Sequence, residues 1–248
     1  MGRLTGKRAV VTGGASGIGE AIARAYAAEG AEVTVADVDG RAAARVAESL
    51  GGIAWQVDLA DTTALEGLEL DTDILVNCAG LQRVASIVDF DPEAWRLLHR
   101  IMLEAPFLLI RAAMPGMIER GFGRIINLSS VHGIRASAFK SAYVAAKHGL
   151  EGLSKVTALE GAPHGITSNC INPAYVLTPL VEQQIADQAR IHGISESDVV
   201  EKIMLTEPAI KKLVPLDDVA SLALWLADEH SGMVTGTSQV IDGGWSAR

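Results

Sequence analysis

One glycine-rich segment near the start of the chain constrains the fold more than any other feature. The sequence TGGASGIG, residues 12–19, directly follows the short apolar run RAVVT and leads into a helix-like stretch, residues 18–29. Glycines let a backbone approach a pyrophosphate closely, and the start of a helix offers free N–H groups and a positive dipole end. The pattern predicts a dinucleotide-binding turn, with an ordinary strand-to-helix turn as the alternative. The predicted contacts are Gly13, Ser16, Gly17, Ile18 and Gly19.

Strand-like and helix-like segments alternate along most of the chain. Short apolar strands that alternate with helices form a parallel sheet covered on both faces. No linker rich in Pro, Gly or Ser divides the sequence. We therefore predict an α/β fold, a single Rossmann-type doubly wound domain over residues 1–248 with a seven-stranded parallel sheet. The predicted strands are residues 8–12, 32–37, 53–57, 73–77, 124–128, 166–171 and 238–241, and the predicted helices include residues 18–29, 40–50, 92–120 and 142–161.

Two segments depart from this alternation, and the first, residues 58–73, is so short that only an abbreviated crossover helix fits in it. Residues 178–213 carry helix-like patterns without a strand, and an insertion after the carboxyl end of a strand lies where open α/β sheets bind their substrates. We therefore expect a helical substrate lid at about residues 178–212. The long helix over residues 92–120 contains Pro106, which lacks a backbone N–H, so a kink is expected there.

The composition predicts a globular chain that does not bind nucleic acid. Hydrophobic residues make up 49% of the sequence, the formal net charge is −9, and Lys and Arg form no basic run. No apolar run looks long enough to cross a bilayer and the first residues do not resemble a signal peptide, so we expect a cytoplasmic protein with no membrane partner. Cys78 and Cys170 are expected to be reduced, and no cluster of His, Cys, Asp or Glu predicts a metal site.

Acidic and small residues follow the second, third and fourth predicted strands. Asp37 lies 18 residues after Gly19, where a carboxylate can accept hydrogen bonds from both hydroxyls of an adenosine ribose. Such a carboxylate repels a 2′-phosphate, and no Lys or Arg is adjacent to it, so the sequence favours NAD over NADP. A strand-end Asp that caps the next turn is the alternative. Further cofactor contacts are expected at Asp58, Leu59, Asn77, Ala79 and Gly80.

Three residues in the second half of the chain have the chemistry to interconvert an alcohol and a carbonyl. Ser130 follows the fifth predicted strand, and Tyr143 and Lys147 are four residues apart on a predicted helix, so these two share a face. A free tyrosine has a pKa of about 10, which a nearby ammonium and a positive nicotinamide ring would both lower. Tyr143 then acts as a general acid and base while Ser130 holds the oxygen. A Tyr-x-x-x-Lys pair by itself is more often only part of a helix surface.

The order of these motifs resembles that of the short-chain dehydrogenase/reductase family. The motifs are TGGASGIG, NCAG, a serine, YVAAK and NPAYVLTP, and the resemblance covers nearly the whole chain. It implies that Ser130, Tyr143 and Lys147 are catalytic and that Tyr143 and Lys147 also contact the cofactor. It further implies a homotetramer built partly from two long helices and the C-terminal strand. Additional cofactor contacts are implied at Pro173, Val176 and Thr178.

One position departs from the family pattern. The family usually has an Asn in its long fourth helix, where it anchors a water of the proton relay, and Met102 occupies that position here. A thioether holds a water poorly. The resemblance therefore implies either a relay through another group or a slower enzyme.

Several stretches are more similar to one subfamily, the D-3-hydroxybutyrate dehydrogenases. They are SVHG, KSAYVAAKHG, TPLVEQQI and the terminal DGGWSAR. Lys140 would supply a cation for a carboxylate, and two amides and an imidazole would orient it through hydrogen bonds. Trp245 is expected to be either a wall of the pocket or an interface aromatic. The substrate contacts implied in this way are Gln82, Ser130, His132, Lys140, Tyr143, Gln184 and Trp245.

Together these inferences predict an NAD-dependent oxidoreductase that reversibly converts (R)-3-hydroxybutyrate, a ketone body, to acetoacetate. The first alternative is a short-chain dehydrogenase for another small hydroxy acid or secondary alcohol. The second is an NAD-binding sensor or scaffold without turnover. The combination of Lys140 with His132 and Gln184 distinguishes a carboxylate substrate from a neutral alcohol.

Overall fold

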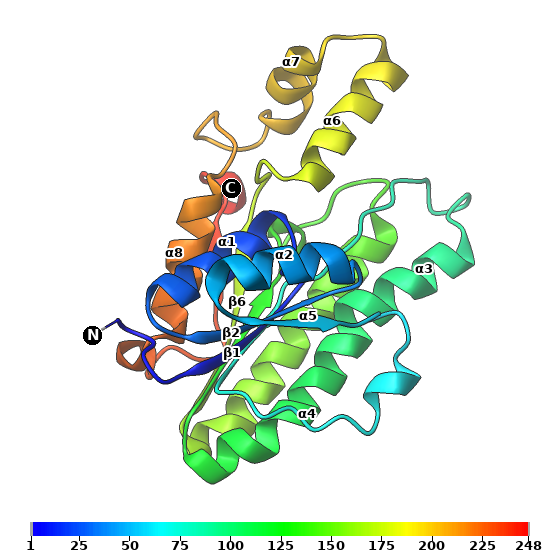
Figure 1. Ribbon diagram of the computed structural model, residues 1–248. Helices are drawn as coiled ribbons and strands as arrows, with labels where there is room; N and C mark the ends of the chain where they lie inside the picture. Colours follow the sequence, from blue (N-terminus) through cyan, green and yellow to red (C-terminus); the bar gives the residue numbers. More distant parts are fainter. Residues whose placement is uncertain (1, 248) are drawn as a thin grey trace.

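The computed structural model describes residues 2–247 and shows a seven-stranded parallel sheet between two layers of helices (Figure 1). The strand order is β3-β2-β1-β4-β5-β6-β7, so the direction of winding reverses between β1 and β4. Ligands of open α/β sheets bind at such a reversal, beyond the carboxyl ends of the strands. The strands are β1 (Arg8–Thr12), β2 (Glu32–Asp37), β3 (Ile53–Gln56), β4 (Ile74–Asn77), β5 (Gly123–Leu128), β6 (Ile166–Pro173) and β7 (Ser238–Ile241).

The predicted fold class and all seven predicted strands are confirmed, with shifts of one or two residues at some ends. Every residue of β4, β5 and β6 is buried, because helices cover both faces of these central strands. Strand β3 lies at the edge of the sheet, and its Ile53 is 51% exposed.

Helices from distant parts of the sequence cover the two faces of the sheet (Figure 1). On one face, α8 packs against α1, where the Tyr26 hydroxyl donates to the Ala223 carbonyl at 3.0 Å. Sequence reasoning did not predict α8. The helices of this face are α1 (Gly17–Ala28), α2 (Gly40–Leu50) and α8 (Leu216–Ala227), and those of the other are α3 (Pro92–His99), α4 (Ala105–Arg120) and α5 (Ser141–Gly161).

The long helix over Pro92–Arg120 contains the irregularity that Pro106 predicts. A π-helical turn, Arg100–Glu104, joins α3 to α4 directly before the proline. Pro106 has no N–H to donate to the carbonyl four residues earlier, that of Met102, so the regular hydrogen-bond pattern is interrupted there. The turn places Met102 in the buried layer between this helix and α5.

The same helix corrects one expectation drawn from the sequence. Over Pro92–Arg120, an 18-residue window has a mean hydropathy of 1.5, so by length and composition alone the helix qualifies as a membrane span. In the fold, 44% of that window is buried, and α4 packs against β5 and α5. These contacts are typical of the core helix of an α/β protein.

The segment expected to form a lid lies beyond the carboxyl edge of the sheet, drawn in yellow at the top of Figure 1. It contains α6 (Pro179–His192), α7 (Glu196–Val199) and a π-helical turn, Val200–Met204. Its own small apolar cluster includes Ile185 and Met204. The segment therefore has a local core, separate from the main core of the sheet.

Both cysteines are free thiols, with Cys170 buried and Cys78 partly buried. Among residues 2–247, no three His, Cys, Asp or Glu side chains gather closely enough to hold a metal ion.

Candidate active site

A cavity of about 540 Å³ opens at the carboxyl ends of the first four strands. Its walls come from the glycine-rich turn, the ends of β2 and β3, the loop after β4 and the start of the lid segment. Most of the predicted cofactor residues thus come together around one space. They are Gly13, Ser16, Gly17, Ile18, Gly19, Asp37, Asp58, Leu59, Ala79, Gly80 and Thr178.

The backbone of the glycine-rich turn is packed so closely that two of its positions cannot accept a side chain. Gly13 has φ +62°, and a Cβ there would lie 2.9 Å from the Cα of Ala79. A Cβ at Gly19 would lie 2.1 Å from the carbonyl oxygen of Gly13. The Ser16 side chain makes no capping bond to α1, so the N–H groups of the first helical turn face the cavity without a side-chain acceptor. This arrangement fits the pyrophosphate of a dinucleotide.

The carboxylate of Asp37 is fixed at the end of β2, on the wall of this cavity. It accepts hydrogen bonds at 3.1 Å from the backbone N–H groups of Ala15 and Asp39. No lysine or arginine is found among the described residues that line the cavity. The wall around Asp37 therefore offers an acceptor for ribose hydroxyls and no cation for a phosphate.

Asn77 lies beside this cavity rather than on its wall. Its Nδ2 donates to Oδ1 of Asn127 at 2.8 Å inside the sheet. The loop that follows is held against β1 by Thr12, whose Oγ1 accepts from the N–H groups of Cys78 at 3.0 Å and Ala79 at 3.3 Å. The structure thus gives Asn77 and Thr12 supporting positions behind the cavity.

The three candidate catalytic residues meet where β5 ends and α5 begins. Lys147 is only 4% exposed, and its Nζ lies 5.6 Å from the centre of the Tyr143 ring. The ammonium donates to the carbonyl of Leu128 at 2.5 Å. Burial lowers the pKa of Lys147 to about 8, although Glu151 and the two cysteines act in the opposite direction.

The expected effect on Tyr143 is not produced by the chain itself. Burial raises the pKa of Tyr143 to about 12, and a hydrogen bond with Ser130 only partly opposes this. Without the cofactor, the chain therefore does not bring this pKa below the ordinary value of a tyrosine, because desolvation of the phenolate outweighs the hydrogen bond with Ser130. A positive nicotinamide ring would have to supply the missing stabilisation.

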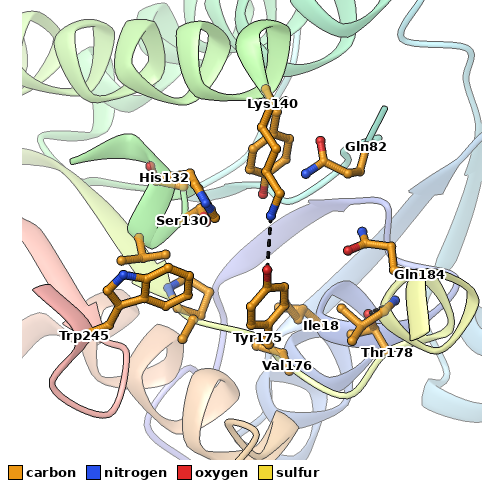
Figure 2. Close-up of a pocket in the computed structure, with 16 residues that line it drawn as sticks. Ile18, Gln82, Ser130, His132, Lys140, Tyr175, Val176, Thr178, Gln184 and Trp245 are labelled. Atoms are coloured by element: carbon orange, nitrogen blue, oxygen red, sulfur yellow. Dashed lines mark hydrogen bonds between the residues drawn. The ribbon is translucent and has the colours of Figure 1, made fainter. Parts of the chain in front are cut away.

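All seven predicted substrate contacts line a second, smaller cavity of about 120 Å³ (Figure 2). They come from the loops after β4 and β5, from α5 and α6, and from the last turn of the chain. Ile18 and Thr178 line both cavities, which therefore adjoin. The predicted residues in this wall are Gln82, Ser130, His132, Lys140, Tyr143, Pro173, Val176, Gln184 and Trp245.

The His132 imidazole is held between two hydroxyl groups. Its Nδ1 lies 3.4 Å from Ser130 Oγ, and its Nε2 lies 2.9 Å from Ser137 Oγ. Burial, followed by the charge of Lys140, lowers the pKa of His132 to about 3. The ring is therefore neutral and acts as a hydrogen-bonding group.

Lys140 provides the positive charge of this cavity. It follows Phe139, the one residue other than glycine with a positive φ, +67°, in the described part of the chain. The carbonyl of Phe139 accepts from the N–H of Ala85 at 3.0 Å, which ties this bend to the loop after β4. The Nζ of Lys140 donates to the hydroxyl oxygen of Tyr175 at 3.2 Å.

The remaining polar wall is formed by two amides from different elements. Gln82 follows β4 and Gln184 lies on α6 (Figure 2). Oε1 of Gln82 is buried without a hydrogen-bond partner among the described residues. Buried polar atoms are normally paired, so this oxygen fits a site that a polar ligand completes.

Trp245 forms part of the wall of the smaller cavity, which was one of the two roles expected for it from the sequence. Its ring makes edge contact with His132 at 5.6 Å and lies 5.9 Å from the ring of Tyr175. The carboxylate of Asp242 holds the turn, accepting from Gly244 N at 2.8 Å and Ser246 N at 2.7 Å. The C-terminal turn thus closes one side of the cavity.

Comparisons with known proteins identify the family to which this architecture belongs. The enoyl-(acyl carrier protein) reductase family model matches residues 13–246. A D-beta-hydroxybutyrate dehydrogenase from Rhizobium meliloti is 46% identical in sequence, and the alignment covers 98% of this chain and 99% of that protein. A D-beta-hydroxybutyrate dehydrogenase from Cupriavidus necator is 43% identical, and the alignment covers 99% of this chain and all of that protein, 100%. This chain belongs to the short-chain dehydrogenase/reductase family.

Solved structures agree with this assignment to the short-chain dehydrogenases. One from Agrobacterium tumefaciens, described as a candidate 2-deoxy-D-gluconate 3-dehydrogenase with bound NADP, has a TM-score of 0.86 and 33% identity. The match covers 99% of this chain and 98% of that one. The chain is therefore an oxidoreductase that binds a nicotinamide dinucleotide.

Met102 belongs to an apolar layer beside Tyr143, the candidate catalytic tyrosine. The side chain is 1% exposed and belongs to a cluster with Leu98, Ala142 and Ala146, against which Tyr143 packs. His99 points elsewhere, since its ring stacks on Trp95 with centres 3.6 Å apart. The side chain of Met102 therefore makes an apolar contact on this side of Tyr143, at the position where the family pattern has the amide of an asparagine.

Sequence reasoning did not single out several members of the substrate cavity. Tyr175 lies within the quoted motif NPAYVLTP, and its aromatic side chain among small and β-branched residues was the available signal. Ser129, Val131, Ala174 and Val181 also line the cavity, but nothing in their sequence context marks them.

Proposed function

We propose that this enzyme reversibly oxidises (R)-3-hydroxybutyrate to acetoacetate with NAD. The observation that carries the proposal is the set of side chains in the smaller cavity, where Lys140 and two amides lie with Tyr143 and Ser130. A cation and several hydrogen-bond donors suit the carboxylate of a small hydroxy acid. Two relatives above 40% identity, each described as a D-beta-hydroxybutyrate dehydrogenase, support the same substrate.

The preference for NAD rests on Asp37. Its carboxylate is held toward the larger cavity by two backbone N–H groups, and ribose hydroxyls can donate to it. A 2′-phosphate would meet this negative charge with no cation among the described lining residues. The solved relative with bound NADP, at 33% identity, makes the cofactor a point to test directly.

The proposed mechanism assigns one task to each catalytic side chain. The bound nicotinamide would supply the hydride acceptor, and most of the residues that would hold the cofactor line the larger cavity. Tyr143 takes the proton of the substrate hydroxyl in oxidation and returns it in reduction. Ser130 holds the substrate oxygen, and Lys147 favours the phenolate and binds the ribose. Water would be excluded as residues 178–212 close and Gln184 reaches the carboxylate.

We further propose that the enzyme is a homotetramer in the cytoplasm and binds neither a membrane nor nucleic acid. Large apolar side chains remain exposed on the helical layer of α3, α4 and α5 and on β7. Exposed apolar surface of this extent suits an interface between subunits. The side chains are Trp95, Phe107, Ile118, Val156, Leu159 and Val240, which are 39–78% exposed.

The first test is NADH formation by the purified protein, followed by its near-ultraviolet absorbance. The substrates are (R)-3-hydroxybutyrate and its (S)-enantiomer, each with NAD and with NADP. We expect turnover of the (R)-acid with NAD. Turnover of both enantiomers alike, or of neither while NADH still binds, would overturn the proposed substrate.

A second measurement separates a hydroxy acid from a neutral secondary alcohol as the substrate. Lys140→Met removes the ammonium and keeps an apolar stem, so KM for a carboxylate substrate should rise at least tenfold, a loss typical of a charged hydrogen bond. Turnover of a neutral alcohol should change little. Equal losses on both would exclude Lys140 as the carboxylate partner.

A further inference from the structure

One phenol in the smaller cavity has no part in the mechanism above. Tyr175 lies on the loop after β6, and its hydroxyl oxygen is 3.2 Å from Nζ of Lys140, as the dashed line in Figure 2 marks. Its backbone carbonyl accepts from Val214 N at 2.8 Å, and its ring lies 5.9 Å from that of Trp245. Backbone and ring contacts therefore hold the hydroxyl in place.

The chemistry of this pair fixes which atom donates. An ammonium has three donors and no acceptor, so the oxygen of Tyr175 must accept from Lys140. The hydrogen of the phenol is then directed away from the cation and is left for another acceptor. Because both side chains line the cavity, the pair presents two donors from neighbouring atoms to the same space.

A carboxylate is the group that completes this arrangement. It has two oxygens that accept hydrogen bonds and carries the charge that an ammonium favours. A neutral hydroxyl could take one of the two donors but would leave the ammonium without a counter-charge. The two side chains belong to different elements, since Lys140 precedes α5 and Tyr175 follows β6.

We propose that Tyr175 is a substrate-binding residue whose hydroxyl and the Lys140 ammonium together bind the substrate carboxylate. The inference rests on the proposed function in that the substrate is a small hydroxy acid. Ser130 and Tyr143, on another part of the wall, hold the reacting hydroxyl. Tyr175 thus fixes the orientation of the acid and takes no part in proton transfer.

The test removes one oxygen atom. In Tyr175→Phe, KM for (R)-3-hydroxybutyrate should rise about tenfold, while kcat and KM for NAD stay within about twofold. Acetate, used as a competitive inhibitor, should bind about tenfold more weakly. The matched control is Tyr26→Phe, whose hydroxyl donates to Ala223 within the core, and which should keep the wild-type KM. NADH binding verifies that each variant is folded.

A double-mutant cycle separates a shared carboxylate site from a purely structural contact. If Tyr175 and Lys140 act as one unit, Tyr175→Phe in the Lys140→Met background should raise KM by much less than tenfold. An unchanged KM and unchanged acetate inhibition in Tyr175→Phe would overturn the proposal. A lower kcat with an unchanged KM would also overturn it, since the hydroxyl would then act in the chemical step.

These readouts also distinguish this proposal from the proposed function. If the wild-type enzyme oxidises a different hydroxy acid, the assignment to 3-hydroxybutyrate fails. The effect of Tyr175→Phe on that acid and on acetate inhibition still decides the role of Tyr175. If the wild-type enzyme oxidises (R)-3-hydroxybutyrate and Tyr175→Phe leaves KM for this acid unchanged, the proposed function is supported. The proposed role of Tyr175 is then wrong.

Discussion

The Nζ of Lys147 lies 2.5 Å from the carbonyl oxygen of Leu128, the last residue of β5. This bond joins α5 to the carboxyl edge of the sheet. It places a buried ammonium beside the ring of Tyr143, which lines the smaller cavity. The end of a strand therefore sets the position of the charge on which the proposed proton transfer depends.

Replacing that ammonium should remove most of the activity. In Lys147→Met, we expect kcat to fall roughly 10²–10⁴-fold, because the phenolate of Tyr143 loses its nearest cation. KM for NAD should rise as well. The control is Lys155→Met, which changes an exposed lysine on the same helix and should keep its activity. A kcat near that of the wild type would show that Lys147 is only structural.

The cofactor preference should depend on the charge at position 37. Asp37→Asn keeps an acceptor oxygen but removes the negative charge, so kcat/KM for NADP relative to NAD should rise about tenfold, equivalent to about 1.4 kcal/mol. Asp39→Asn serves as the control, since Asp39 caps α2 by accepting from Arg41 and Ala42. The same shift in both variants, or a wild-type preference for NADP, would contradict the role given to Asp37.

The pH dependence should report a neutral imidazole at His132. Burial lowers its pKa to about 3, below the ordinary value of about 6.5, so KM for the hydroxy acid should show no inflection from this ring near neutral pH. The pKa of His132 is lower in the folded protein than in the unfolded chain, so between about pH 3 and 6.5 the unfolded chain binds the proton more readily. Stability should therefore fall as the pH drops from about 6.5 toward 3, and less so in His132→Gln. Imidazole chemical shifts that titrate near 6.5 would refute this.

A second pH effect should come from Asp228, far from both cavities. The backbone N–H of His230 and the side chain of Arg3 donate to its carboxylate at 2.9 Å and 2.6 Å, and they hold its pKa below the usual range. A lowered carboxyl pKa stabilises the fold above about pH 4 and loses this effect as the pH falls through the folded pKa. Asp228→Asn should lower Tm at pH 7 by roughly 2–5 °C.

The difference in Tm between Asp228→Asn and the wild type should shrink on acidification below about pH 4. Asp198→Asn is a suitable control, because its partner Lys202 is an exposed neighbour at 2.8 Å and such pairs contribute little. A difference for Asp228→Asn that stays constant down to pH 2 would mean that the carboxylate charge is not what stabilises this turn.

Local sequence patterns were sufficient for the strands and for the glycine-rich turn. The turn was readable because Gly13 and Gly19 occupy positions where a Cβ would collide with the backbone. Helix α8 was missed because its N-cap is Pro215, whose side chain makes no capping bond, so the start of the helix carried no strong signal. The role of Tyr175 was missed because its contacts come from positions distant in the chain.

By itself, the sequence determined the alternation of strands and helices, the glycine turn, and the pairing of Tyr143 with Lys147 on one helical face. Each of these depends on steric limits and periodicities that span only a few residues. The tertiary structure alone decided that burial raises the pKa of Tyr143, that Lys140 bonds to Tyr175, and that Trp245 closes the cavity. These features depend on distance and desolvation between groups far apart in the chain, which local patterns do not encode.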